Sequence, residues 1–349
     1  MNPQKVVISE NLTEALATAI AECEHDRTFI LVDETTERCC LPIVSGLDCV
    51  RGAQIIVIGA TDSHKTLESL SHVWEALGEG GATRHSLLIN IGGGMVTDLG
   101  GFAASTFKRG INYINIPTTL LSMVDASVGG KTGFNFRGLK NEIGVFNNAN
   151  CVILDTTFLK TLDEENILSG YAEMLKHGLI ANEQMWATLM NFDVEQPDLK
   201  VLGKMVAESV AVKQRIVTED PTEKGIRKAL NLGHTMGHAF ESLALQRNPV
   251  LHGYAVAWGL IGELYLSAIK TGFPSDKMHQ TVRFIQEHYG KMDITCDDYP
   301  TLLELMTHDK KNVAGVINFT LLGGIGDIRI NQTATKDEIY EALDFYREG

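Results

Sequence analysis

The chain has 349 residues, of which 44% are hydrophobic and 21% charged, proportions that exclude a disordered or fibrous protein. Its 44 acidic and 30 basic residues give a formal net charge of −14, which argues against nucleic acid or an anionic membrane as the main partner. We find no apolar run of about 18 residues and no apolar core of a signal peptide near the first residue. Six cysteines without C-x-x-C spacing are typical of free thiols in a reducing compartment, so we expect a cytoplasmic protein.

Short apolar runs alternate with helix-length segments over the first 160 residues. They predict strands over 28–32, 54–58, 86–91, 113–116 and 151–154. Such runs are typical of a parallel sheet covered by helices on both faces. Farther along, the sequence predicts long helices over 164–180, 200–217 and 255–271, and one strand over 315–322. We therefore predict an α/β domain over 1–160 and a mostly helical domain over 161–349.

A glycine-rich segment, NIGGGMVTDLGG, follows the predicted strand at 86–91 and opens a helix. Glycines there would let backbone N–H groups approach a phosphate, although a tight strand-to-helix turn is the structural alternative. The dinucleotide template G-x-G-x-x-G is only partly met, because Thr97 stands at its third glycine. In DASVGGKTG, Asp125 stands where a P-loop needs glycine, so a P-loop is excluded and Lys131 is left as a cation for an anionic ligand.

Histidines gather in the second half of the chain. His234 and His238 are four residues apart, which places them on one face of a helix, and His252 follows at the start of another. Thr235 replaces the glutamate of H-E-x-x-H, which argues against a zincin protease. Two imidazoles and one carboxylate, for which Glu173 is the candidate, would leave a coordination position of a metal open. Core histidines satisfied by the backbone are the structural alternative.

Arg227 lies about one helical turn before Asn231 and two before His234. If that stretch is helical, we expect the three side chains on one face and the guanidinium directed at the metal site. The alternative is a solvent-facing arginine that pairs with an acid such as Glu223.

Together these segments resemble the 3-dehydroquinate synthase family almost from end to end. The resemblance rests on IGGGMVTDLGGFAA, FKRGI, IPTTLLSMVDASVGGKTG, KNEIGVF, LSGYAEMLKHGLI, IRKALNLGHTMGHAFE, LHGYAVAWG and HDKKN, in this order. It implies a Rossmann-like N-terminal domain with a parallel sheet, a mostly α-helical C-terminal domain, NAD, one divalent metal (zinc or cobalt), and a homodimer. Asp62 departs from the family, which usually has glutamate there.

The resemblance also implies a role for each matching position. It assigns metal binding to Glu173, His234 and His252. It assigns NAD binding to Asp33, Asp62, Lys65, Gly93, Gly94, Met95, Asp98, Thr118, Thr119 and Thr161, and to Asp125, Lys131 and Lys140. It assigns substrate contacts to Asp125, Lys131, Lys140, Asn141, Lys176, Lys213, Arg227, Asn231, His238 and Lys311, the last with Lys310 as an alternative. Arg109 is implied to reach the active site of the neighbouring subunit.

The implied reaction converts 3-deoxy-D-arabino-heptulosonate 7-phosphate (DAHP) to 3-dehydroquinate and phosphate. Its steps are transient oxidation by NAD, phosphate elimination, re-reduction, ring opening and aldol closure. The alternative is another sugar phosphate cyclase, of the 2-deoxy-scyllo-inosose, amino-dehydroquinate or valiolone type. A polyol dehydrogenase and a non-catalytic NAD-binding protein are more remote. Arg227 and the pair Lys310-Lys311 favour DAHP, because the inosose and valiolone substrates lack its carboxylate.

Overall fold

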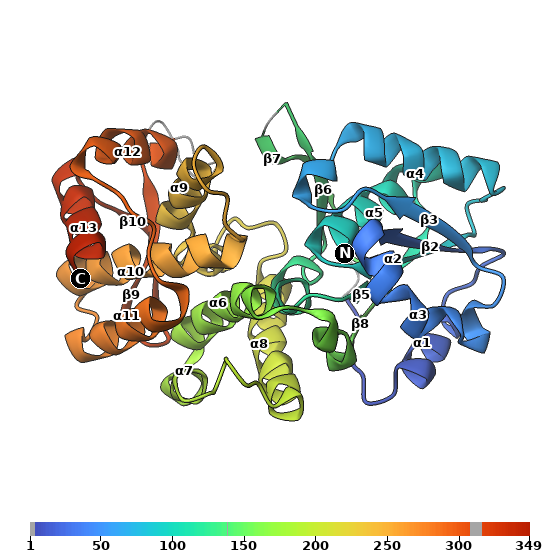
Figure 1. Ribbon diagram of the computed structural model, residues 1–349, viewed down its shortest axis with the longest axis horizontal. Helices are drawn as coiled ribbons and strands as arrows, with labels where there is room; N and C mark the ends of the chain where they lie inside the picture. The colour runs from blue at the N-terminus through green and yellow to red at the C-terminus, as the bar shows by residue number, and fades with distance from the viewer. Residues whose placement is uncertain (1–3, 138, 308–315) are drawn as a thin grey trace. The chain divides into compact units, whose positions relative to one another are not determined.

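The computed structural model describes residues 4–137, 139–307 and 316–349. The chain divides into two compact units (Figure 1). The first comprises Met1–Asp163 and Asp198–Gln214, and the second comprises Glu164–Pro197 and Arg215–Gly349.

A parallel sheet of six strands forms the centre of the first unit, in the order β1-β8-β5-β4-β2-β3. In that order the strands are β1 (Val6–Ile8), β8 (Cys151–Leu154), β5 (Asn112–Pro117), β4 (Leu87–Gly92), β2 (Thr28–Asp33) and β3 (Gln54–Ile58). Strands β4 and β8 are buried along their whole length, which accounts for their mostly apolar sequences. The predicted parallel sheet and its five strands are confirmed, and only the short β1 was not predicted.

Helices of the first unit lie in the connections between strands, and two of them begin within two residues of a strand end. These helices are α1 (Leu12–Ala21), α2 (Glu34–Cys39), α3 (Leu41–Ser45), α4 (Leu67–Glu79) and α5 (Gly94–Thr106). Side chains of Asn11, Asp33 and Thr66 accept hydrogen bonds from the first turns of α1, α2 and α4. Helix α5 follows β4 directly and packs on β4, β5 and the hairpin strand β6 (Lys131–Phe136).

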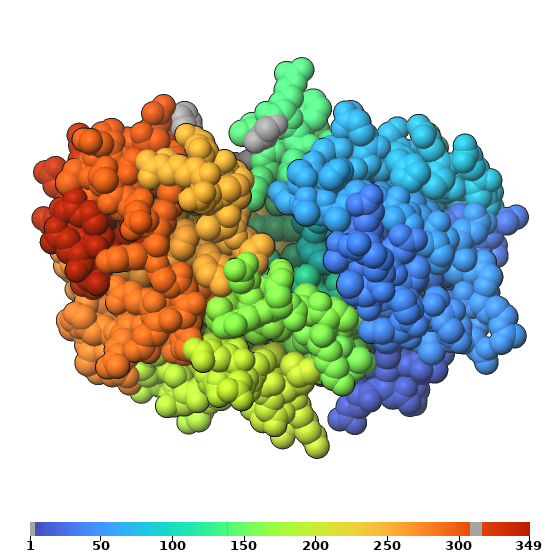
Figure 2. All heavy atoms as spheres, viewed as in Figure 1, coloured from blue at the N-terminus to red at the C-terminus, as the bar shows by residue number. Residues whose placement is uncertain are grey.

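Strands β6 and β7 (Leu139–Phe146) form an antiparallel hairpin that the sequence analysis did not predict. It stands out from the surface of its unit in Figure 2. Most of β7 is exposed, including the apolar side chains of Leu139, Val145 and Phe146. A strand without a buried face lacks the alternation of apolar and polar residues that would have indicated it.

The second unit is mostly helical, as predicted. Its helices are α6 (Glu164–Ala181), α7 (Glu183–Met190), α8 (Leu199–Glu219, which begins in the first unit), α9 (His234–Leu245), α10 (His252–Thr271), α11 (Ser275–Tyr289), α12 (Tyr299–Thr307) and α13 (Lys336–Glu348). An antiparallel pair, β9 (Asn318–Gly324) and β10 (Asp327–Thr333), completes it. Helix α10 is buried over most of its length because it packs against α6, α9, α11, α13 and β9.

The segment before α9 differs from the prediction. Residues Ile226–Asn231 form a short 3₁₀ helix with Leu232 as its C-cap, and Gly233 then adopts a left-handed conformation with φ of 78°. Arg227, Asn231 and His234 therefore do not share one face of a continuous helix. A glycine in this conformation interrupts the helical path.

Within the described ranges, none of the helices combines the length and the apolar character needed to cross a membrane.

Candidate active site

In the first unit, the glycine-rich turn joins the carboxyl end of β4 to α5. Gly93 precedes the helix in an extended conformation, and Gly93, Gly94 and Met95 are partly exposed. Thr118 is buried and donates its backbone N–H to the carbonyl of Gly92 (3.0 Å), which places Thr118 and Thr119 beside the turn. The N-terminus of α5 therefore presents backbone amides where a ligand phosphate can be held.

Lys65 and Asp98 form an ion pair near this turn. The Nζ atom of Lys65, which is 3% exposed, donates to Asp98 Oδ2 (2.6 Å) and to Asn141 Oδ1. Burial raises the pKa of Asp98, and the Lys65 ammonium opposes this rise without cancelling it. The resemblance assigns Lys65 and Asp98 to NAD and Asn141 to the substrate. Lys65 contacts both of the others, so it joins the residues of the two expected ligands.

Other predicted cofactor residues have contacts of their own. Asp33 caps α2, and its Oδ1 accepts from the backbone amides of Thr35 (2.9 Å) and Thr36 (2.7 Å). Asp62 lies 3.8 Å from the Nζ of Lys140, and both side chains are about half exposed. Thr161 donates from Oγ1 to a carbonyl of its own turn. Asp33 thus stabilises the fold at a position where the resemblance implies cofactor contact.

A second ion pair joins Lys213 of α8 to Asp125. The Nζ of Lys213 donates to Asp125 Oδ1 at 2.6 Å, and the lysine side chain is only 7% exposed. Asp125 lies in a π-helical turn, Ser122–Ala126, a rare conformation that is frequent at functional sites. Lys131 is exposed at the start of β6, and Lys311 lies outside the described residues.

The second unit brings the three candidate metal ligands together. Glu173 on α6 is fully buried, and its Oε1 lies 3.3 Å from His234 Nε2 and 3.6 Å from His252 Nε2. Among the described residues, no donor makes a hydrogen bond to this oxygen. A buried carboxylate oxygen that lies beside two imidazole nitrogens is a donor set that suits a divalent cation.

The outer nitrogens of both histidines contact acceptors. His234 Nδ1 lies 3.1 Å from the carbonyl oxygen of Leu232, and His252 Nδ1 lies 3.3 Å from Glu241 Oε2. Neither oxygen has a proton to donate, so each Nδ1 is the donor. In a neutral imidazole, Nε2 then keeps its lone pair for a metal. Glu241 was not among the predicted residues, because its role depends on a contact that the sequence does not show.

Electrostatics keep the carboxylate charged and one imidazole neutral. Burial alone would raise the pKa of Glu173, but the adjacent ammonium of Lys176 and the His234 ring together hold it well below its usual range. Burial lowers the pKa of His234 to about 4, so its imidazole is neutral at pH 7. Burial also opposes a charge on His252, but Glu241 and Glu173 outweigh it and raise the pKa of that ring to about 10.

His238 completes a group of three histidines. Its ring lies one turn along α9 from His234, with 5.3 Å between the ring centroids, and 5.8 Å from the ring of His252. The ring nitrogens of the three residues lie within 4.8 Å of one another. The predicted common face of His234 and His238 is confirmed.

Close helix packing brings His252 to Glu173. Gly253, the second residue of α10, lies so close to α6 that a Cβ atom there would come within 1.9 Å of the Ser169 carbonyl oxygen. The Gly253 amide also donates to Ser169 Oγ (3.1 Å). Only glycine permits this approach of the two helices. It brings His252, the first residue of α10, close to Glu173, which lies one turn beyond Ser169 on α6.

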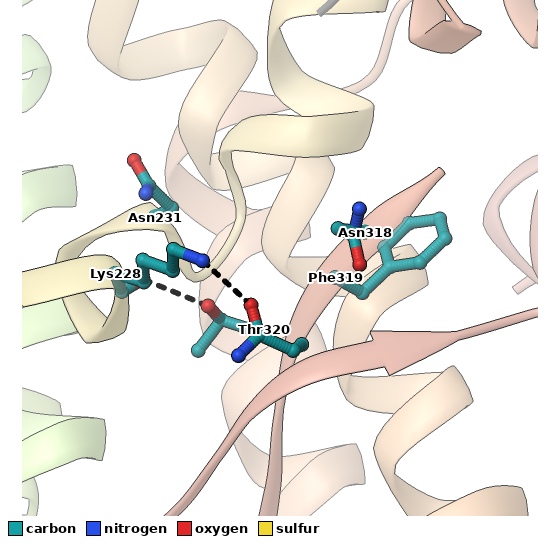
Figure 3. A pocket seen from close by; sticks show the side chains of 6 residues that line it. Lys228, Asn231, Asn318, Phe319 and Thr320 are labelled. Atoms are coloured by element: carbon teal, nitrogen blue, oxygen red, sulfur yellow. Dashed lines mark hydrogen bonds between the residues drawn. The ribbon is translucent and has the colours of Figure 1, made fainter. Parts of the chain in front are cut away.

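Arg227 is 2% exposed, so the alternative of a solvent-facing arginine is wrong. Its Nη1 donates to the carbonyl of Pro221 (2.7 Å), and Asn231 Nδ2 donates to Glu223 Oε1 (2.9 Å). A small polar pocket beside this turn, shown in Figure 3, is lined by Lys228, Asn231, Asn318, Phe319, Thr320 and Asn331. Lys228 ties the turn to β9 and β10, since its carbonyl accepts from Thr320 Oγ1 and its Nζ donates to Asn331 Oδ1, both at 2.8 Å.

Comparison with known proteins decides the family. Two family models, described as 3-dehydroquinate synthase N-terminal and C-terminal, match residues 55–169 and 170–312. A 3-dehydroquinate synthase of Parabacteroides distasonis is 55% identical over 350 residues, covering 100% of this chain and 99% of the relative. The chain belongs to the 3-dehydroquinate synthase family. It is therefore an enzyme of the lyase class, and the resemblance inferred from the motifs is confirmed.

Solved structures of two related cyclases share the fold of this chain but are distant from it in sequence. A 2-epi-5-epi-valiolone synthase from Streptomyces hygroscopicus, with NAD⁺ and Zn²⁺ bound, has a TM-score of 0.86 at 26% identity, covering 99% of this chain and 97% of its own. A 2-deoxy-scyllo-inosose synthase complexed with carbaglucose-6-phosphate, NAD⁺ and Co²⁺ has a TM-score of 0.81 at 24% identity, covering 99% and 96%. Both are far less similar in sequence than the dehydroquinate synthase of P. distasonis.

Proposed function

We propose that this chain converts DAHP to 3-dehydroquinate and phosphate, with one divalent metal held by Glu173, His234 and His252. The observation that carries the metal site is the buried Glu173 Oε1, which faces two Nε2 atoms and accepts no hydrogen bond from the described residues. Family membership supports the substrate, since the dehydroquinate synthase of P. distasonis matches the whole chain. Bound NAD and metal supply a hydride acceptor and Lewis-acid polarisation of a substrate oxygen.

The proposed roles of the side chains follow from their charges. Lys176 neutralises one oxygen of Glu173 and leaves the other for the cation. Arg227 offers a planar fork that matches the DAHP carboxylate, whereas Lys131 and Lys213 act as point charges toward phosphate. His238, one turn from His234, is the candidate for moving a proton at the substrate phosphate. The amides of Gly93 and Gly94 would hold the NAD phosphates.

Location, metal identity and assembly are also proposals. The resemblance supports a cytoplasmic homodimer to which Arg109 contributes across the subunit boundary. Imidazole nitrogen and carboxylate oxygen are ligand types that bind both zinc and cobalt.

The decisive experiment measures phosphate release from DAHP with NAD⁺ and Zn²⁺ or Co²⁺. We expect turnover that a chelator abolishes and that added metal restores, and no release from glucose 6-phosphate. His252→Ala should remain folded by circular dichroism but lose metal and activity. Release from glucose 6-phosphate but not DAHP would instead assign the chain to the inosose type. A His252→Ala variant with normal metal content would exclude the proposed ligand set.

A further inference from the structure

Glu263, a second buried carboxylate, contacts the start of the helix that carries His234. It lies on α10 and its exposed fraction is 0%. Its Oε2 accepts from the backbone N–H of Gly233 (2.6 Å), and its Oε1 accepts from that of Met236 (3.0 Å). Both oxygens are therefore directed at the N-terminus of α9, where helix N–H groups lack partners within the helix and favour a negative charge.

Helix α9 requires this contact because its capping position cannot supply one. The cap is Gly233, which has no side chain and has a φ of 78°. A Cβ atom there would lie 2.8 Å from the side chain of Leu260, so the serine or aspartate that usually caps a helix does not fit. Glu263, on the same helix as Leu260, supplies the missing acceptor from outside α9.

We propose that Glu263 is a positioning residue for the metal site, acting through the backbone on His234. The inference rests on the proposed metal ligands. His234 is the first residue of α9 and lies between the two amides that Glu263 binds. His252 is the first residue of α10, which carries Glu263. The carboxylate therefore joins the helices of the two imidazole ligands and sets the separation of their Nε2 atoms before a metal binds.

The experiment compares Glu263→Gln with a matched control, Ser267→Ala. Ser267 is also fully buried on α10, one turn farther along, and its Oγ hydrogen-bonds to the Glu263 carbonyl and the Leu322 amide. Both variants lose a buried hydrogen bond of this helix, but only Glu263→Gln changes the cap of α9. Metal affinity is measured by Zn²⁺ competition with a chelator, and ligand geometry by the visible absorption of the Co²⁺ form.

We expect Glu263→Gln to bind Zn²⁺ roughly 10- to 100-fold more weakly and to show an altered Co²⁺ spectrum, as for other residues that orient metal ligands. Ser267→Ala should stay within about twofold of the wild type, even at equal loss of thermal stability. Wild-type affinity and spectrum in Glu263→Gln would overturn the inference, as would equal weakening in Ser267→Ala. Undiminished affinity in His252→Ala would instead overturn the metal site itself.

A measurement on the unaltered protein covers the case in which Glu263→Gln does not fold. Metal is removed from the wild type, and hydrogen exchange is followed at the amides of Gly233 and Met236. If Glu263 organises the site before metal binds, both amides stay protected in the metal-free protein. Exchange as fast as in exposed loops would mean that the metal orders this turn, and would overturn the inference.

Discussion

Glu173 shows how one residue can be prepared for a cation by its neighbours alone. A fully buried carboxylate would normally take up a proton, because desolvation penalises its charge. Lys176, equally buried and one turn away, contacts Oε2 and reverses that preference. Removing the lysine would leave an uncompensated buried charge, which typically costs about 3–5 kcal/mol. Charge on one oxygen is thus balanced within the helix, while the other oxygen faces the imidazoles.

Arg227→Gln tests recognition of the substrate carboxylate. Loss of a charge-assisted, bidentate contact should cost on the order of 2–4 kcal/mol, or roughly 30- to 1000-fold in kcat/KM for DAHP. Lys228→Gln is the matched control, because it removes the neighbouring positive charge, which is bound to Asn331. A fall of less than about threefold in Arg227→Gln, at normal stability, would show that the carboxylate is held elsewhere.

Asp98→Ala tests the nucleotide half of the site. Asp98 anchors the buried Nζ of Lys65, so its loss removes one proposed NAD contact and releases another. We expect the Kd for NAD to rise roughly 10- to 100-fold, as for loss of a charged hydrogen bond. Glu79→Ala, an equal change of charge at an exposed position of α4, should bind NAD like the wild type. Equal affinities in the two variants would remove Asp98 from the NAD site.

Residue type and spacing were enough to propose His234, His252 and Glu173 as a set, because imidazoles and a lone acid on apolar helices have few other uses. Glu241 and Glu263 were not found. Glu241 contacts His252, and Glu263 contacts the amides at the start of α9, so each role depends on another part of the fold. Acids on helices are usually solvated, and the sequence alone does not single these two out. Which acids turn inward depends on how α9 and α10 pack, and that packing is set by glycines rather than by a visible motif.

At the scale of elements, the contact between α6 and α10 depends on Gly253. In Gly253→Ala the added methyl group would collide with the Ser169 carbonyl, so α10 must move away from α6. We expect a loss of about 1–3 kcal/mol in the free energy of unfolding, although alanine is the better helix former. Metal affinity should fall as well, because His252 moves with the helix.

Gly324→Ala is the matched control, since nothing lies within 4 Å of a Cβ atom there. Denaturant unfolding and chelator competition measure the two effects. Unchanged stability and unchanged metal affinity in Gly253→Ala would show that the helices are not held at this distance.

Elements with a strong periodic pattern could be predicted, and those without one could not. The buried strands and long helices matched their apolar runs, whereas β7 is exposed and β1 has only three residues. The expected common face of Arg227, Asn231 and His234 required a continuous helix, and Gly233, which is left-handed, interrupts it. The requirement for glycine there arises from Leu260, which belongs to another helix, so the local sequence does not show it.

At the scale of the whole molecule, one helix belongs to both units. Residues Asp198–Gln214 group with the first unit although they follow the start of the second, and α8 continues to Glu219. Lys213 thus contacts Asp125 within the first unit although the two residues are 88 positions apart in the sequence. A division of the chain at one position, such as the predicted one near residue 160, does not describe a segment that returns to the first unit.

Arg109 provides a test of assembly. It is exposed after α5, and it and Lys108 both have positive φ values, 71° and 48°, a conformation that is uncommon for residues other than glycine. If Arg109 serves the neighbouring subunit, Arg109→Ala and His252→Ala should each be inactive alone but complement each other when mixed. In a hybrid dimer, one site would then have both residues, giving about a quarter of wild-type activity after random reassortment.

If Arg109 instead serves its own subunit, each site of the hybrid lacks one residue and the mixture stays inactive. Co-purification of an untagged variant with an affinity-tagged one verifies that hybrids form, so an inactive hybrid dimer would contradict the exchange.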